Sequence, residues 1–296
     1  MSDRPVLLEV DDLRAGFGAV PVLHGVDFRV YEGEVAAVLG LNGAGKSVTL
    51  KVVGGILPAW AGRIRFDGAD ITHMTAEERV ARGMAHVPQG RQVFPDLTVE
   101  QNLRLGAYTL RRRAPKRYAA ALDGVLQRFP RLAERRKQAA GTLSGGEQAM
   151  LAVGRALMSE PKLVLVDEAS AGLAPIAVQA LFETLRDVNR SGVTILMVEQ
   201  NVTFTLGIAD RAHIMQQGVI VYDGDVAALD QERVAGLLGI GRLLGRSVAA
   251  AAAGRRAVAS TNGQPKTKRA PVKTKRAPAK AKRTPAKAAA KRRKAT

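Results

Sequence analysis

A glycine-rich stretch that ends in a lysine and a serine is the first place in this sequence where chemistry can be expected. It follows the apolar run VAAVLG and precedes the helical pattern SVTLKVVGGIL, which is the context that a phosphate-binding loop requires. Its glycines would let backbone N–H groups and a helix N-terminus face phosphates. Lys46 is predicted to reach the β- and γ-phosphates of a nucleotide, and Ser47 to place its hydroxyl on Mg²⁺. A plain glycine-rich turn is the alternative interpretation. The stretch matches GxxxxGK[ST] and comprises Gly40, Leu41, Asn42, Gly43, Ala44, Gly45, Lys46 and Ser47.

Two adjacent acids, Asp167 and Glu168, end the apolar run LVLV. Residues in this place emerge at the carboxyl edge of a parallel sheet, where ligands bind. Asp167 is predicted to hold Mg²⁺ through a water molecule, and Glu168 to polarise the attacking water as a general base. Two surface acids that cap a strand are the alternative, which the motif around Lys46 disfavours.

A third motif, LSGGEQ, opens a helical pattern 23 residues before Asp167, counted from its serine. Ser144, Gly145, Gly146 and Glu147 predict a second helix N-terminus that can bind phosphate. In isolation the same letters would be an ordinary helix cap. Together with the first two motifs they indicate a second nucleotide contact.

The elements that must position these residues alternate between strands and helices. Runs that are apolar on both faces indicate buried parallel strands at 35–40, 162–168 and 193–199. The segments LLEVDDL, VDFRVYEGE and HIMQQGVIVYDG instead show the alternation of a half-exposed antiparallel sheet. Between about 95 and 158 strand signals fade, and 97–129 and 145–158 are predicted to be helical. The predicted fold class is α/β, with a helical insertion.

Charge separates the chain into a body and a tail. The 296 residues carry a formal charge of +18, yet residues 255–296 alone contain 16 lysines and arginines and no acid. The tail repeats PVKTKRA, PAKAKRT and PAKAAAK, and a proline every seventh residue excludes a coiled coil. The predicted organisation is an ATP-binding domain over 1–240, a linker over 241–254 and a disordered tail over 255–296. There is no cysteine, no run of ~20 apolar residues and no secretory leader, so we expect a cytoplasmic protein.

With these motifs in order, the chain resembles the ATP-binding subunits of ABC transporters over about residues 5–240. The resemblance implies a RecA-like P-loop NTPase core with an N-terminal antiparallel β-subdomain and a helical subdomain. It also implies two such domains joined head to tail, so that Ser144 and Gly146 contact ATP held by the partner. Gln89 matches the family's glutamine loop, which senses Mg²⁺ and nucleotide and touches the transmembrane subunits. Phe17 stands where the family stacks an aromatic ring on adenine, although a core aromatic is equally compatible.

The segments GRQVFPDLTVEQNL, GLAP and VEQN narrow the resemblance to the ATPases of branched-chain amino-acid importers. Gln200 replaces the histidine that contacts the γ-phosphate in most relatives; glutamine still donates a hydrogen bond but cannot carry a proton. Val48 follows the phosphate loop where serine or threonine is common, which leaves only its backbone N–H as a contact. Ala169 and Ala174 replace a proline and an aspartate.

The resemblance implies an ATPase that uses ATP and Mg²⁺ and powers transport through separate permease subunits. It implies a homologous ATPase as partner, a substrate-binding protein served indirectly, and a place on the inner face of the cell membrane. Importers of urea or short amides are alternatives for the substrate. A nucleic-acid-associated ABC ATPase is the alternative for the function, because the basic tail could bind DNA as well as an anionic membrane.

Overall fold

The computed structural model describes residues 4–108, 110 and 114–238. The predicted linker 241–254 and tail 255–296 lie outside the described residues. The chain divides into a unit of Met1–Arg246 and a unit of Ser247–Thr296, and all described residues belong to the first. In the described ranges, no helix combines the length and the apolar composition that crossing a membrane requires.

The N-terminal part of the chain forms a four-stranded antiparallel sheet in the order β2-β1-β4-β5. Alternating side chains of its long strands are buried, as the alternating sequence pattern predicts. Gly18, in the left-handed conformation (φ 58°), lies in the tight turn between the first two strands. The strands are β1 (Val6–Phe17), β2 (Val20–Tyr31), β4 (Ala61–Phe66) and β5 (Ala69–Asp70).

The second sheet has six strands in the order β10-β9-β3-β8-β7-β6. Its strands run parallel except β10, which pairs antiparallel with β9. The antiparallel prediction for 213–224 is therefore right for the hairpin, but β9 itself pairs in parallel with β3 and is buried. The strands are β3 (Val35–Leu39), β6 (Met84–Val87), β7 (Leu163–Asp167), β8 (Thr194–Val198), β9 (Arg211–Gln216) and β10 (Val219–Asp225).

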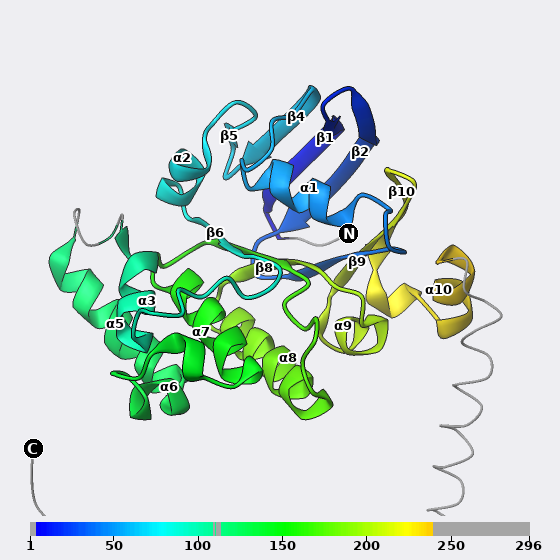
Figure 1. The fold of residues 1–296 in the computed structure, drawn as a ribbon. Helices are drawn as coiled ribbons and strands as arrows, with labels where there is room; N and C mark the ends of the chain where they lie inside the picture. Colours follow the sequence, from blue (N-terminus) through cyan, green and yellow to red (C-terminus); the bar gives the residue numbers. More distant parts are fainter. Residues whose placement is uncertain (1–3, 109, 111–113, 239–296) are drawn as a thin grey trace, which may run out of the picture. The chain divides into compact units, whose positions relative to one another are not determined.

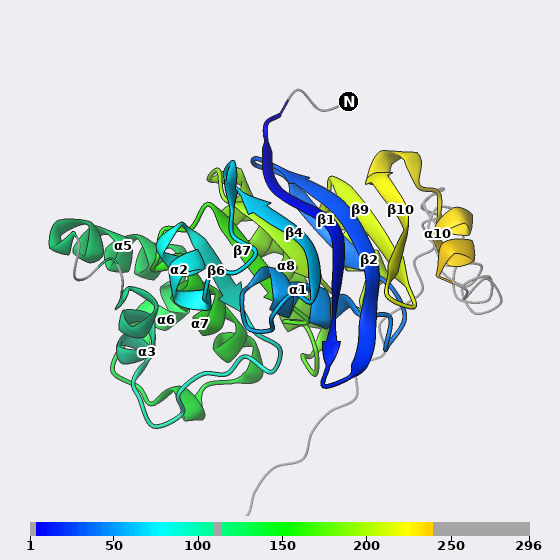
Figure 2. The same cartoon turned by 90° about the horizontal axis from the view of Figure 1, so that it is seen from above.

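The parallel strands are apolar on both faces because each face belongs to a different core. In β3, Val35, Ala37 and Leu39 pack into the core shared with the helices. Ala36 and Val38 point the other way, into the core shared with the antiparallel sheet. Helix α1 (Lys46–Val53) lies between the two sheets (Figures 1 and 2). Such two-sided burial is typical of a parallel sheet covered on both faces.

Helices cover the other face of the six-stranded sheet and form the predicted insertion (Figure 1). The predicted helix at 97–129 is interrupted, since α3 ends at Gly106 and α5 begins with Pro115, a residue suited to the first helical position. The remaining helices are α2 (Ala76–Ala81), α3 (Val99–Gly106), α5 (Pro115–Arg128), α6 (Pro130–Glu134), α7 (Gly145–Leu157), α8 (Pro175–Arg190), α9 (Val202–Ile208) and α10 (Gln231–Leu237), with single 3-10 turns η1 (Ala140–Thr142) and η2 (Val226–Ala228).

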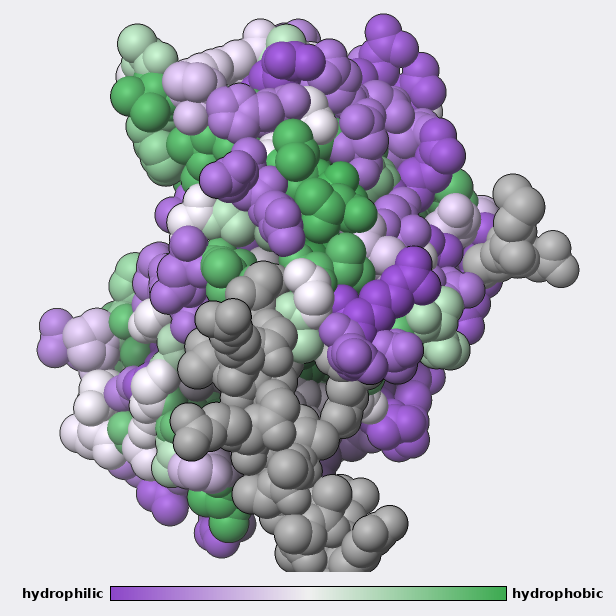
Figure 3. Space-filling view, turned by 90° about the vertical axis from the view of Figure 1, so that its right-hand side faces the viewer, coloured by the Kyte–Doolittle hydropathy of each residue, from purple (hydrophilic) through white to green (hydrophobic). Residues whose placement is uncertain are grey.

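Strand β10 is the edge of the six-stranded sheet, on the side of the molecule seen in Figure 3. Hydrophilic residues dominate this face and surround a smaller hydrophobic group. In the hairpin, Arg211 of β9 forms ion pairs with Asp223 and Asp225 of β10. Charged side chains on an edge strand discourage pairing with another sheet.

Candidate functional site

Four neighbouring strands of the six-stranded sheet end at one edge, and each is followed by residues that were predicted to do chemistry. Strand β3 leads into the loop 40–45, β8 to Gln200, β7 to Glu168 and β6 to Gln89. Because these strands are adjacent and parallel, their carboxyl ends lie side by side. The topology therefore gathers residues that are up to 160 positions apart in the sequence.

The loop after β3 turns into helix α1 through Gly45, whose φ of 106° suits glycine. A Cβ at Gly45 would lie 2.9 Å from a methyl carbon of Leu23, so the loop also needs a residue without a side chain there. The N-terminus of α1 faces the loop and favours anions. Lys46, the first residue of α1, is buried and donates from Nζ to the carbonyl oxygens of Gly40 (3.0 Å) and Leu41 (3.1 Å). Burial lowers the pKa of Lys46, and the nearby carboxylates oppose this shift.

Ser47 and Asp167 meet at the bottom of this site. The hydroxyl of Ser47 donates to Oδ1 of Asp167 at 2.8 Å. Burial raises the pKa of Asp167, while the hydrogen bond from Ser47 and the lysines of α1 lower it. The pair presents two hard oxygen ligands, and the described residues contain no group of three His, Cys, Asp or Glu side chains that could hold a metal. Mg²⁺ usually keeps water and phosphate oxygens among its ligands, so a site beside a phosphate loop needs only a few protein oxygens.

Glu168 receives two amide side chains from different strands. Gln89 donates from Nε2 to Oε2 of Glu168 at 2.8 Å, and Gln200 donates from Nε2 to the same oxygen at 2.7 Å. Glu168 itself has a φ of 43°, a conformation that costs a non-glycine residue about 1 kcal/mol or more and that persists only when its surroundings enforce it. Both amides bind Oε2, and among the described residues no hydrogen bond reaches Oε1.

A pocket of about 410 Å³ joins these residues to the tip of the antiparallel sheet. Phe17 is 52% exposed and reaches this pocket from the end of β1. Val22, which no sequence motif indicated, completes the wall. The pocket is lined by Phe17, Val22, Asn42, Gly43, Gly45, Lys46, Ser47, Val48, Glu168 and Gln200.

The LSGGEQ residues lie at a different groove. Ser144 caps α7: its hydroxyl oxygen accepts from the backbone N–H of Glu147, and the Glu147 carboxylate accepts from the backbone N–H of Ser144. These hydrogen bonds lower the pKa of Glu147. Ser144, Gly146 and Glu147 line this groove with Ile176, which is 80% exposed. The structure thus does not bring the LSGGEQ residues into the pocket of Lys46 and Glu168.

Other polar residues support the site without any sequence signal that could have revealed them. Glu199 is buried, and its carboxylate accepts from the backbone N–H (3.0 Å) and the hydroxyl of Ser170. This ties the end of β8 to the loop that follows Glu168. Burial raises the pKa of Glu199, and the hydrogen bonds from Ser170 oppose the shift. Two arginines hold the glutamine loop, the segment after β6 that contains Gln89. Arg91 of this loop donates to the carbonyl oxygen of Ala171, and Arg155 donates to that of Gln92.

A glycine loop that delivers a buried lysine, a serine paired with an aspartate, and a glutamate held by two amides together define a phosphate-loop ATPase. Residues 23–171 match the family model described as ABC transporter. The chain belongs to the ABC transporter family, in which it is an ATP-binding and ATP-hydrolysing subunit.

Curated relatives agree with this assignment. The chain is 43% identical over 229 residues to the high-affinity branched-chain amino acid transport ATP-binding protein BraG of Pseudomonas aeruginosa, covering 77% of this chain and 97% of BraG. It is 37% identical over 221 residues to the probable branched-chain amino acid transport ATP-binding protein LivF of Archaeoglobus fulgidus, covering 74% and 92%. It is 31% identical over 225 residues to the lipopolysaccharide export system ATP-binding protein LptB of Escherichia coli, covering 76% and 93%.

A nucleotide-free crystal structure of an ATP-binding cassette from an ABC transporter is similar in fold. It has a TM-score of 0.69 and 27% identity, and covers 81% of this chain and 97% of that one. The predicted fold class, a P-loop core with an antiparallel subdomain and a helical subdomain, is confirmed for the residues that the structure describes.

Proposed function

We propose that this chain is the ATPase subunit of an importer for branched-chain amino acids. The observation that carries the proposal is the convergence on Glu168 of two amides, next to a pocket that holds Lys46 and Ser47. The names of the relatives BraG and LivF supply the substrate class. Urea and short amides are the alternative substrates, and the permease and binding protein would decide between them.

In this mechanism the glycine loop and Lys46 hold the phosphates of ATP, and Phe17 stacks on the adenine. Ser47 and Asp167 would hold Mg²⁺, with Gln89 as a further contact, and the cation would neutralise charge on the phosphates. Glu168 accepts a proton from the attacking water through Oε1, while Gln89 and Gln200 fix its carboxylate through Oε2. Such positioning is the protein's main contribution to phosphoryl transfer.

The separate groove lined by Ser144, Gly146 and Glu147 fits a composite site. The start of α7 is a capped helix N-terminus suited to phosphate, yet it does not line the pocket of Lys46. We therefore propose that it binds ATP held by a second, homologous ATPase. Gln200 cannot take up a proton as histidine can, which favours a heterodimer with unequal sites.

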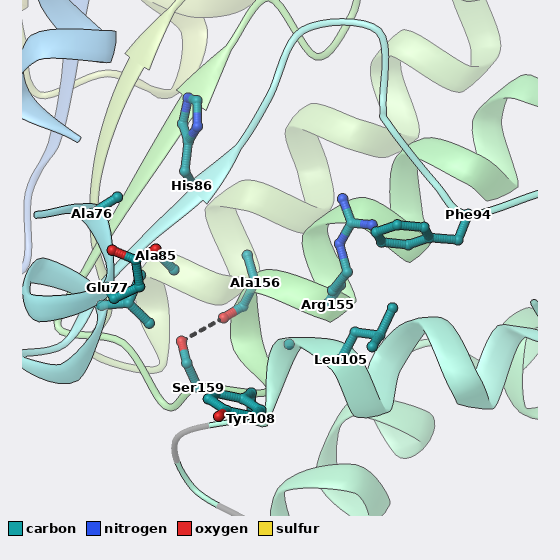
Figure 4. A pocket seen from close by; sticks show the side chains of 12 residues that line it. Ala76, Glu77, Ala85, His86, Phe94, Leu105, Tyr108, Arg155, Ala156 and Ser159 are labelled. Atoms are coloured by element: carbon teal, nitrogen blue, oxygen red, sulfur yellow. Dashed lines mark hydrogen bonds between the residues drawn. The ribbon is translucent and has the colours of Figure 1, made fainter. Parts of the chain in front are cut away.

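A groove of about 490 Å³ beside the glutamine loop fits a permease segment (Figure 4). Its wall is mainly apolar, from Phe94, Leu105 and Tyr108, which are all exposed. His86 also lines it, and burial lowers the pKa of His86 to about 4, so the ring is neutral near pH 7. An exposed apolar groove whose Arg155 holds the backbone of the glutamine loop is suited to an amphipathic helix of a membrane subunit. This assembly would place the chain on the inner face of the cell membrane.

The test uses Glu168→Gln, which keeps the shape of the side chain and removes its basicity. A deletion strain is complemented with wild type or with this variant, and uptake of labelled leucine, urea and a short amide is measured. The expected result is loss of leucine uptake and of ATP hydrolysis in the purified complex, with ATP binding retained. Wild-type hydrolysis in the variant would disprove the ATPase site. Loss of urea or amide uptake, with leucine uptake intact, would show that urea or the amide is the transported substrate in place of leucine.

A further inference from the structure

The glutamine loop has a backbone that its own sequence does not favour. Gly90, Arg91 and Gln92 follow one another with φ values of 74°, 67° and 40°. For the two non-glycine residues this left-handed conformation costs about 1 kcal/mol or more each. Contacts from other elements must therefore hold the loop in this shape.

The side chain of Arg91 connects this loop to two others. Its Nη2 donates to the carbonyl oxygens of Ala171 and Gly172, both at 3.3 Å. These carbonyls belong to the loop between Glu168 and α8. The guanidinium also covers Gly145, the first residue of α7, where a Cβ would lie 3.0 Å from Nη1. Arg91 thus touches both the loop that follows Glu168 and the start of the LSGGEQ helix.

The backbone of the same loop is held from the groove side by Arg155 of α7. Its Nη1 donates to the carbonyl oxygen of Gln92 at 2.8 Å, and its Nη2 donates to that of Arg91 at 3.5 Å. The guanidinium lies over the ring of Phe94, 5.5 Å from its centre, and both side chains line the groove (Figure 4). Because Gln89 binds Glu168, contacts run without a gap from the groove to Glu168.

We infer that Arg91 is a positioning residue that sets the geometry of Glu168 and of the LSGGEQ helix together. The inference rests on the proposed function, because it assigns Arg91 a part in the geometry of the proposed ATPase site. A planar guanidinium can donate to two neighbouring carbonyls at once while it covers Gly145. A lysine ammonium on a flexible stem cannot reproduce that geometry.

The test compares Arg91→Ala and Arg91→Lys in the complex isolated from native membranes through a tag on this chain. Arg91→Ala is expected to lower kcat for ATP hydrolysis about tenfold or more and to change KM by less than about twofold, since the phosphate contacts remain. Millimolar guanidinium chloride should restore part of the lost activity in Arg91→Ala, and Arg91→Lys should remain impaired. Arg190→Ala is the matched control, because Arg190 ends α8 about 22 Å from the helix start and pairs only with Asp187 among the described residues.

An unchanged kcat in Arg91→Ala would overturn the inference. A wild-type kcat in Arg91→Lys would also overturn it. The same holds if guanidinium does not rescue Arg91→Ala and the loss of kcat is accompanied by a matching loss of thermal stability. Glu168→Gln in the same preparation distinguishes a failure of the proposed function from a failure of the role of Arg91. If Glu168→Gln still hydrolyses ATP, the proposed function fails; if it is inactive while Arg91→Ala behaves as wild type, only the role of Arg91 fails.

Discussion

The carboxylate of Glu168 is held by two amide side chains, which both donate a hydrogen bond to the same oxygen. Gln89 arrives from the segment after β6 and Gln200 from the segment after β8, and both donate to Oε2. The pair restrains the carboxylate more than either amide alone would. We therefore expect the two glutamines to act as one unit on Glu168, the proposed general base.

This shared oxygen predicts that the effects of Gln89→Ala and Gln200→Ala on kcat do not add. Each single variant is expected to lower kcat about tenfold. The change in activation free energy of the double variant is expected to differ from the sum of the two single changes by an interaction energy of about 1 kcal/mol. Steady-state hydrolysis by the four members of the cycle measures this. Gln179→Ala serves as the control, since Gln179 is exposed on α8 and its amide binds Glu183 rather than Glu168. Strict additivity of the two losses would show that the amides act independently.

Much of this chemistry could be predicted from residue types and their order along the chain. Lys46, Ser47, Asp167 and Glu168 each follow a recognisable strand, so their meeting at one sheet edge is a consequence of topology. The role of Arg91 could not be predicted in the same way. An arginine that binds backbone carbonyls leaves no pattern in the sequence, because the carbonyls belong to every residue type.

At the level of elements, the helices differ in how their first turns are satisfied. Thr75, Thr98 and Ser144 begin α2, α3 and α7 with complete capping boxes. The N-cap residue of α8 is Ala174, which has the extended backbone of a cap residue (φ −64°, ψ 149°) but no side chain that can accept a hydrogen bond. The helix next to the loop of Glu168 is thus the one of these four that lacks a side-chain cap.

Replacing Ala174 with Asp is expected to stabilise the protein. The carboxylate can accept from the backbone N–H of Ile176, or share that of Ala177, which now donates to the carbonyl oxygen of Ala174 at 2.9 Å. It also favours the helix dipole, and together these effects contribute about 1 kcal/mol. Urea denaturation of the ATPase domain measures the change in free energy of unfolding. Ala174→Asn separates the hydrogen bond from the charge, and a destabilised Ala174→Asp would mean that the cap geometry does not form.

Strands β3, β7 and β8 begin and end within about one residue of the predicted runs, because two-sided burial gives a continuous apolar signal. The parallel pairing of β9 with β3 was harder to predict from the sequence. Its sequence HIMQ includes a histidine that is fully buried against Phe28, with ring centres 5.0 Å apart. A polar residue in a buried strand imitates the alternation of a half-exposed one, so the pattern favoured the antiparallel hairpin and concealed the parallel neighbour.

At the scale of the whole molecule, Glu34 stands where the two sheets join and should make stability depend on pH. It precedes β3, accepts from the backbone N–H of Tyr31 at 2.8 Å, and faces Arg211, Asp210 and Arg4. Burial raises the pKa of Glu34 from 4.5 to about 7. Between these values the folded state binds the proton that the unfolded state has lost, so stability falls as pH rises through this window.

Relative to Glu34→Gln, wild type is expected to lose up to about 3 kcal/mol of unfolding free energy between pH 4.5 and pH 7, and to change little above. Urea titrations of both proteins at several pH values measure this difference. Glu32→Gln is the control, because Glu32 is exposed and lies two residues away. A difference between wild type and Glu34→Gln that does not vary with pH would contradict the assignment.

The tail belongs to the scale of the whole chain, because it carries nearly all of the net charge. Residues 255–296 lie outside the described residues and contain 16 basic residues, which leaves 29 basic against 27 acidic residues elsewhere. Removing them is expected to leave ATP hydrolysis and the thermal unfolding of the ATPase domain unchanged. It should abolish binding to anionic vesicles or to DNA, whichever the full chain binds at low salt.

The physical reason is that such binding depends on released counterions, so the affinity of the full chain should fall steeply, by about 10³-fold or more, between 50 and 200 mM salt. Sedimentation with phosphatidylserine vesicles and electrophoretic shifts of duplex DNA distinguish the two surfaces. Binding to vesicles alone supports a second contact with the membrane beside the permease, worth about 1 kcal/mol for each basic residue that reaches the headgroups. Binding to DNA alone would instead favour the nucleic-acid role, and equal binding by the full and the shortened chain would remove the tail from either function.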